Sequence, residues 1–82
     1  MTKEEILERV TSVLTQSFDL EPGLVTPTAH LIDDLDLDSI DAIDMVVGLE
    51  EETGLDISED ELKSVRVVQD VVDLLYRHLA AG

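Results

Sequence analysis

The 82-residue sequence contains no cysteine and no tryptophan, and it has only one tyrosine and one phenylalanine. Without cysteine the chain can form neither a disulfide framework nor a thiolate metal site, so any thiol chemistry needs a thiol from outside the polypeptide. Basic residues are also scarce: 5 Lys and Arg stand against 20 Asp and Glu, and the formal net charge is −15. Nucleic acids and anionic membrane surfaces are therefore poor partners, because both bind clustered Lys and Arg.

Long apolar runs are absent as well. No stretch approaches the roughly 18 consecutive apolar residues of a membrane-spanning helix, and the first five residues lack the apolar run of a signal peptide. We therefore expect a cytoplasmic, monomeric protein without membrane insertion. The length fits one domain over residues 1–82 and excludes a multidomain enzyme, while Leu, Ile, Val and Phe supply 29 residues for a thin core.

The spacing of apolar residues predicts helices. Thr2 and Glu5 form a capping box ahead of a first helix that ends near Ser17. A second helix is predicted from Ser39 to about Thr53, where a glycine follows. Ser58 and Glu61 form another capping box, which opens a short helix. A last helix carries one apolar face: Val68, Val71, Val72, Leu75 and Leu79.

A long connection of residues 19–38 separates the first two helices and contains both prolines. Loops of about twenty residues are unusual in so small a domain and are often functional. We expect its apolar side chains to pin it across the helices: Leu24, Val25, Leu31, Ile32, Leu35 and Leu37. No strand alternation of useful length appears. The predicted fold class is all-α, a small bundle of three main helices plus one short helix with a long first loop.

The second helix has two apolar faces. One can pack into the core and consists of Ala42, Met45, Val46 and Leu49. The other consists of Ile40, Ile43 and Val47, flanked by Asp44, Glu50 and Glu51. A thin bundle cannot easily bury both, so the second stripe either reaches solvent as a docking surface or is covered by the loop. Gly48, within this helix, predicts room for a chain or a partner.

Charge also distinguishes this region. From Val10 to Leu62 there is no Lys or Arg, and 15 acidic residues fall in that span. Such a surface attracts basic partner proteins quickly and with strong salt dependence.

The densest acidic segment, Asp33 to Asp41, surrounds Ser39. An EF-hand calcium-binding loop is excluded, because Ser39 stands where such a loop requires glycine and Met45 stands where it requires glutamate. A serine nucleophile also lacks support, since there is no Gly-x-Ser-x-Gly elbow and neither His30 nor His78 fits a triad pattern. From spacing alone, Ser39 is interpreted as a helix N-cap.

The tripeptide Asp38-Ser39-Ile40 resembles the Asp-Ser-Leu motif of acyl carrier proteins. The resemblance covers essentially the whole chain, including Leu31 to Leu35 before the motif, the glutamates that end the second helix, and the segments Leu55 to Ser58 and Val68 to Val72. It implies a non-enzymatic carrier whose Ser39 is joined covalently to 4′-phosphopantetheine. It also implies that Asp38 helps to hold magnesium while a transferase loads the serine.

The same resemblance implies partners with basic docking surfaces: a phosphopantetheinyl transferase, acyl transferases, ketosynthases and ketoreductases. Combined with the helical positions, it gives an expected docking set of Asp38, Ile40, Asp41, Ile43, Asp44, Val47, Glu50, Glu51 and Ile57. Acyl intermediates would be carried as thioesters for type II fatty-acid or polyketide biosynthesis, for example of aryl-polyene type. Ile40, Asp36 and Lys63 depart from the common family pattern and favour a specialised pathway.

Three alternatives stay open at this point. The chain could be an unmodified acidic helical adaptor that docks basic proteins, a peptidyl or aminoacyl carrier, or a helical protein that responds to divalent ions.

Overall fold

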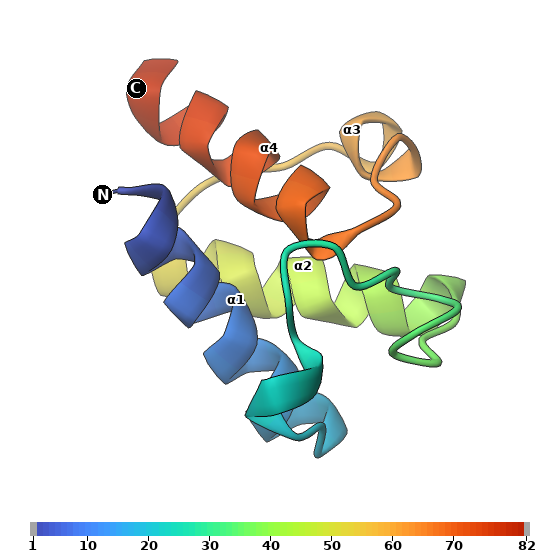
Figure 1. Cartoon of the computed structure of the whole chain (residues 1–82). Coiled ribbons are helices and arrows are strands. Elements are labelled where there is room, and N and C mark those ends of the chain that lie inside the picture. The colour runs from blue at the N-terminus through green and yellow to red at the C-terminus, as the bar shows by residue number, and fades with distance from the viewer. Residues whose placement is uncertain (1, 82) are drawn as a thin grey trace.

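The computed structural model describes residues 2–81 and contains four α-helices and one 3₁₀ turn within them. These are α1 (Lys3–Phe18), η1 (Pro22–Leu24), α2 (Ser39–Thr53), α3 (Glu59–Lys63) and α4 (Val68–Ala81). The helices α1, α2 and α4 pack around a common centre, and the long loop crosses in front of α2 (Figure 1). The predicted all-α fold class, with three main helices and one short helix, is confirmed.

Local signals in the sequence set the helix ends. The Thr2 hydroxyl accepts a hydrogen bond from the Glu5 N–H at 3.2 Å, and the Thr2 N–H donates to the Glu5 carboxylate at 3.1 Å. This confirms the capping box of α1. Gly54 ends α2 with a left-handed φ of 73°, which glycine adopts without strain.

Burial of one face from each long helix forms the core. Its largest fully buried side chains are Ile6, Val10 and Leu14 of α1, Met45 and Leu49 of α2, and Val68, Val72 and Leu75 of α4. At the crossing of α1 and α2, a Cβ placed on Gly48 would lie 3.1 Å from Val13 Cγ1. Gly48 therefore lets α1 approach α2 closely, and the expectation that it leaves room for a chain or a partner stays a prediction.

The long loop is pinned as expected, with two exceptions. Val25, Leu31, Leu35 and Leu37 are buried, whereas Leu24 and Ile32 expose 50% and 55% of their surface. The backbone also ties the loop to the segment before α4, because the Leu31 N–H donates to the Arg66 carbonyl and the Val68 N–H donates to the Ala29 carbonyl, both at 3.0 Å. The loop thus has a fixed path beside α4.

Asp36 takes a left-handed conformation in this loop, with φ of 57°. Asparagine tolerates this region better than alanine does. We therefore expect Asp36→Ala to have a free energy of unfolding about 0.5–1 kcal/mol below that of Asp36→Asn. Both variants remove the same charge, so urea denaturation of the pair isolates the backbone effect. Equal stabilities would contradict the left-handed assignment.

Candidate functional site

Ser39 is the first residue of α2 and is exposed to solvent. The preceding Asp38 caps the helix, since its Oδ1 accepts a hydrogen bond from the Asp41 N–H at 2.8 Å. Asp41 Oδ2 in turn accepts one from the Asp38 N–H at 3.3 Å. The interpretation of Ser39 as the N-cap is therefore wrong, because Asp38 takes that place. No hydrogen bond to the Ser39 hydroxyl is found among residues 2–81.

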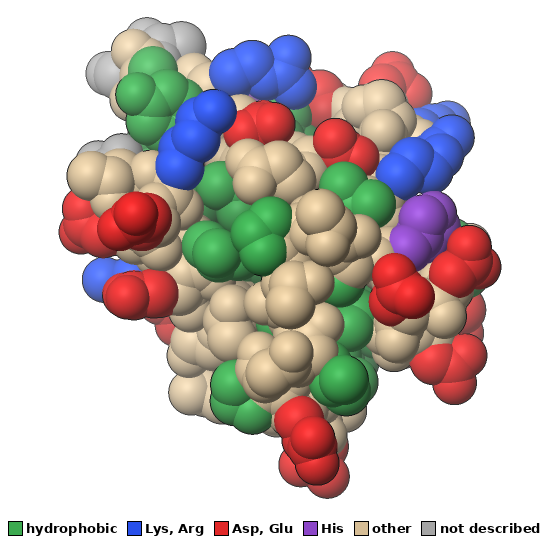
Figure 2. Space-filling model, in the orientation of Figure 1, with side chains coloured by type: hydrophobic (Ala, Val, Ile, Leu, Met, Phe, Trp, Pro, Cys, Tyr) green, Lys and Arg blue, Asp and Glu red, His purple; other side chains and the backbone are tan. Residues whose placement is uncertain are grey.

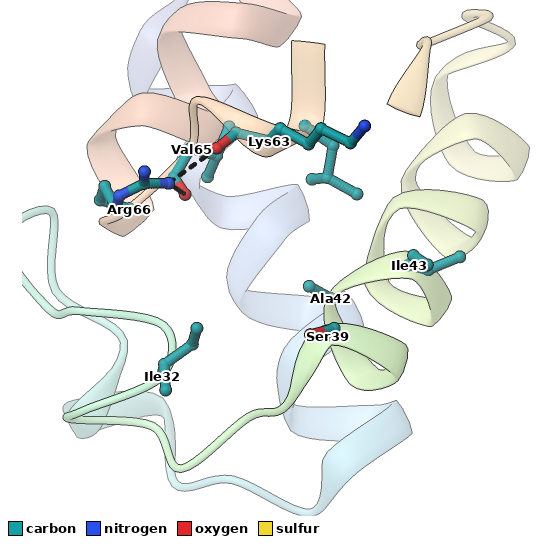
Figure 3. A pocket seen from close by; sticks show the side chains of 8 residues that line it. Ile32, Ser39, Ala42, Ile43, Lys63, Val65 and Arg66 are labelled. Carbon is teal, nitrogen blue, oxygen red and sulfur yellow. Dashed lines mark hydrogen bonds between the residues drawn. The ribbon is translucent and has the colours of Figure 1, made fainter. Parts of the chain in front are cut away.

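Ser39 lines a cavity of about 340 Å³. Three segments form its walls: the start of α2, the loop at Ile32, and the end of α3 with the connection to α4. Figure 3 shows Ile32 and the α3–α4 residues facing α2 across this space. The remaining lining residues are Ala42, Ile43, Leu62, Lys63, Val65 and Arg66. The cavity therefore has mostly apolar walls and two cations beside an exposed hydroxyl.

An apolar stripe reaches solvent along α2. Ile40 exposes 69% of its surface, Ile43 42% and Val47 47%. Asp44 and Glu51 beside it are also exposed. The solvent-exposed stripe is thus confirmed, and the alternative that the loop covers it is wrong. Figure 2 shows acidic side chains along the left, right and lower edges of one face of the molecule and Lys and Arg mainly along its upper edge.

Ile57, which was also expected to dock partners, is buried, unlike the residues of the exposed stripe. Only 8% of its surface is exposed, and its N–H donates a hydrogen bond to Glu50 Oε2 at 3.3 Å. Val47, Glu50 and Ile57 nevertheless line one cavity of about 220 Å³ between α2 and the segment before α3. The structure therefore brings these three residues to one cavity, although Ile57 is largely buried.

The histidines take structural positions. His30 Nδ1 accepts hydrogen bonds from the backbone N–H groups of Ile32 and Asp33 at 3.3 and 3.2 Å. His78 Nε2 lies 2.6 Å from Glu61 Oε2 and joins α4 to α3. Neither residue lines the cavity of Ser39. Within the described chain, no three potential metal-ligating side chains converge, so the role of Asp38 in holding magnesium stays a prediction.

Arg66, Leu62 and Val65 were not predicted as site residues. They line the same cavity as Ser39 because the α3–α4 connection lies across from the start of α2, which helical periodicity alone does not reveal. One signal was present in the sequence, since Lys63 and Arg66 are the first basic residues after Arg9.

Residues 4–75 match a family model described as a phosphopantetheine attachment site. The chain is also similar to "Acyl carrier protein 2" of Ralstonia nicotianae, with 51% identity over 99% of this chain and 100% of that protein. The chain belongs to the acyl carrier protein family. Further similar relatives are the acyl carrier proteins of Thermosynechococcus vestitus, 36% identical over 99% of this chain and all of that protein, and of Petrotoga mobilis, 34% identical over 96% and 93%.

Acyl carrier proteins are carriers and not enzymes, and 4′-phosphopantetheine is their prosthetic group. Membership implies interaction with a phosphopantetheinyl transferase and with biosynthetic enzymes. No helix within residues 2–81 combines the length and apolar character that crossing a membrane requires.

Proposed function

We propose that Ser39 is the attachment residue for 4′-phosphopantetheine and that the chain carries acyl intermediates for type II fatty-acid or polyketide biosynthesis. The observation that supports this most directly is the Ser39 hydroxyl itself. It is exposed, lies at the start of a long helix and forms no hydrogen bond with the described residues. It is thus free to form a phosphodiester without breaking a structural contact.

The surroundings of Ser39 fit the prosthetic group. When attached, 4′-phosphopantetheine supplies the terminal thiol that holds an acyl group as a thioester, which this cysteine-free chain cannot supply itself. The adjoining cavity of about 340 Å³ has apolar walls formed in part by Ile43, Leu62 and Val65. Asp38 and Asp41 place two carboxylates beside the serine, and we assign Asp38 to hold magnesium during loading.

The exposed stripe of Ile40, Ile43 and Val47, with its acidic rim, is proposed as the surface on which partner enzymes dock. Apolar contact gives such a surface area to bury, and the carboxylates attract basic partners and set their orientation. Asp36 and Lys63, together with Ile40, support a specialised pathway over a housekeeping one.

Intact-mass measurement tests the proposal. The purified protein is incubated with coenzyme A, magnesium and a broad-specificity phosphopantetheinyl transferase, and its peptides are then mapped. We expect one phosphopantetheine per chain, on the peptide that contains Ser39. An unmodified chain, or modification of another residue, would overturn the proposal, and the former result would favour an acidic adaptor.

Reversing one charge tests the docking surface. Asp44 is exposed and forms no hydrogen bond or ion pair among the described side chains, so Asp44→Lys should leave the fold unchanged. At low ionic strength we expect it to slow loading by the transferase several-fold to about tenfold, because electrostatic attraction controls encounter. Glu8→Lys on α1 makes the same charge change and should load normally. Equal loading rates for the two variants would contradict docking at α2.

A further inference from the structure

Two of the five basic residues in the chain line the same cavity as Ser39. They are Lys63, the last residue of α3, and Arg66, in the connection to α4. Figure 3 shows both on the side of the cavity opposite the start of α2. In a protein with a formal net charge of −15, this places a local positive wall across from the exposed hydroxyl.

Neither Lys63 nor Arg66 forms a close ion pair with a carboxylate among the described residues. By contrast, Lys3 and Arg9 contact carboxylates at 3.1 and 3.2 Å. Lys63 Nζ lies 3.7 Å from Asp60 Oδ1, and the two side chains are 77% and 94% exposed. An ion pair of that length and exposure contributes little, so Lys63 can exchange this partner for another anion.

Arg66 is held by the backbone. Its Nη1 donates hydrogen bonds to the carbonyls of Lys63 at 2.7 Å and Val65 at 3.2 Å. No carboxylate pairs with it among the side chains that the structure describes. These bonds fix one nitrogen of the guanidinium and leave the other donors available, and a planar guanidinium suits phosphate and carboxylate oxygens.

We propose that Lys63 and Arg66 bind an anion tethered at Ser39 and so draw the tethered group over the cavity. This inference rests on the proposed attachment at Ser39. An anion at that serine has the carboxylates of Asp38 and Asp41 beside it on α2, and the compensating positive charge lies on the opposite wall. The apolar walls between them suit the uncharged part of the tethered group.

The anion can come from two sources. One is the phosphodiester that joins the arm to the serine, and the other is a carboxylate on the acyl group that the arm carries. In both cases the cations would select for negative charge in the tethered ligand, and the second case would make this a carrier adapted to acidic acyl groups.

Melting temperatures of defined loaded states test the inference. The wild type, the double variant Lys63→Gln/Arg66→Gln and the control Arg77→Gln are each prepared unloaded and loaded from coenzyme A, butyryl-coenzyme A and succinyl-coenzyme A. Arg77 is an exposed cation of α4 outside the cavity, so its variant shows what the loss of one positive charge elsewhere on the surface does. Mass spectrometry confirms the loading of each sample.

If the phosphodiester is bound, loading from coenzyme A changes the melting temperature about 2–4 °C more favourably in the wild type and Arg77→Gln than in the double variant. If an acyl carboxylate is bound, the succinyl form should melt about 2–4 °C higher relative to the butyryl form in the wild type and Arg77→Gln than in the double variant. In either case 1 M KCl should remove the difference, because it shortens the Debye length to about 3 Å.

Identical loading-dependent shifts in all three proteins would overturn the inference while leaving the carrier function intact. Absence of loading in the wild type would instead refute the proposed function itself. The two failures are therefore distinguished by mass before any melting curve is measured.

Discussion

Replacing Ser39 by alanine should abolish loading completely. Alanine lacks the oxygen through which a phosphodiester forms, so we expect no phosphopantetheine on Ser39→Ala after incubation with coenzyme A and transferase, under conditions that modify all of the wild type. Because Asp38 rather than Ser39 caps α2, the free energy of unfolding should change by no more than about 0.5 kcal/mol. Intact mass and urea denaturation measure the two effects.

Ser17→Ala supplies the matched control. Ser17 is an exposed serine near the end of α1, and this variant should load like the wild type. Phosphopantetheine on Ser39→Ala would show that another hydroxyl accepts the group. Loss of helical signal in Ser39→Ala would show that the serine stabilises α2, and loading would then have to be measured on a folded variant that also lacks a hydroxyl, such as Ser39→Glu, whose carboxylate suits the start of a helix.

The second large effect is expected in the core. Leu75 is fully buried on α4, and truncation of buried leucine to alanine costs about 2–5 kcal/mol. A domain of this size has a total free energy of unfolding of roughly 4–12 kcal/mol. Leu75→Ala should therefore lose a large share of its stability, with a melting temperature at least about 10 °C lower.

Leu24→Ala makes the same chemical change at a leucine that is 50% exposed. Its melting temperature should fall far less, because much of the removed surface already contacts water. Thermal denaturation followed by circular dichroism compares the two variants directly. Similar losses in both would contradict the burial of Leu75 in the core.

The helices could be predicted because their signals are local. Capping residues such as Thr2 and a glycine such as Gly54 act on the backbone of adjacent residues, and apolar periodicity shows which face of a helix is buried. The exposed stripe on α2 followed from the same reasoning, since a thin bundle cannot cover two faces of one helix.

The remaining features depend on how distant segments meet. Nothing local in the sequence shows that Gly48 faces Val13, or that Ile32 turns outward while its neighbour Leu31 is buried. Arg66 could not be predicted as a site residue for the same reason, because its place across the cavity from Ser39 results from the path of the α3–α4 connection. The acidic surface could be predicted from composition, whereas the positive wall needed the fold.

The backbone bonds between the loop and the connection to α4 have a mechanical consequence. Leu31 is bonded to Arg66, and Ile32, the next residue, forms part of the cavity wall. Two walls of the cavity therefore belong to a single hydrogen-bonded unit and cannot separate from each other independently. A longer tethered group would therefore have to widen the space by moving the loop and the α3–α4 connection together away from α2.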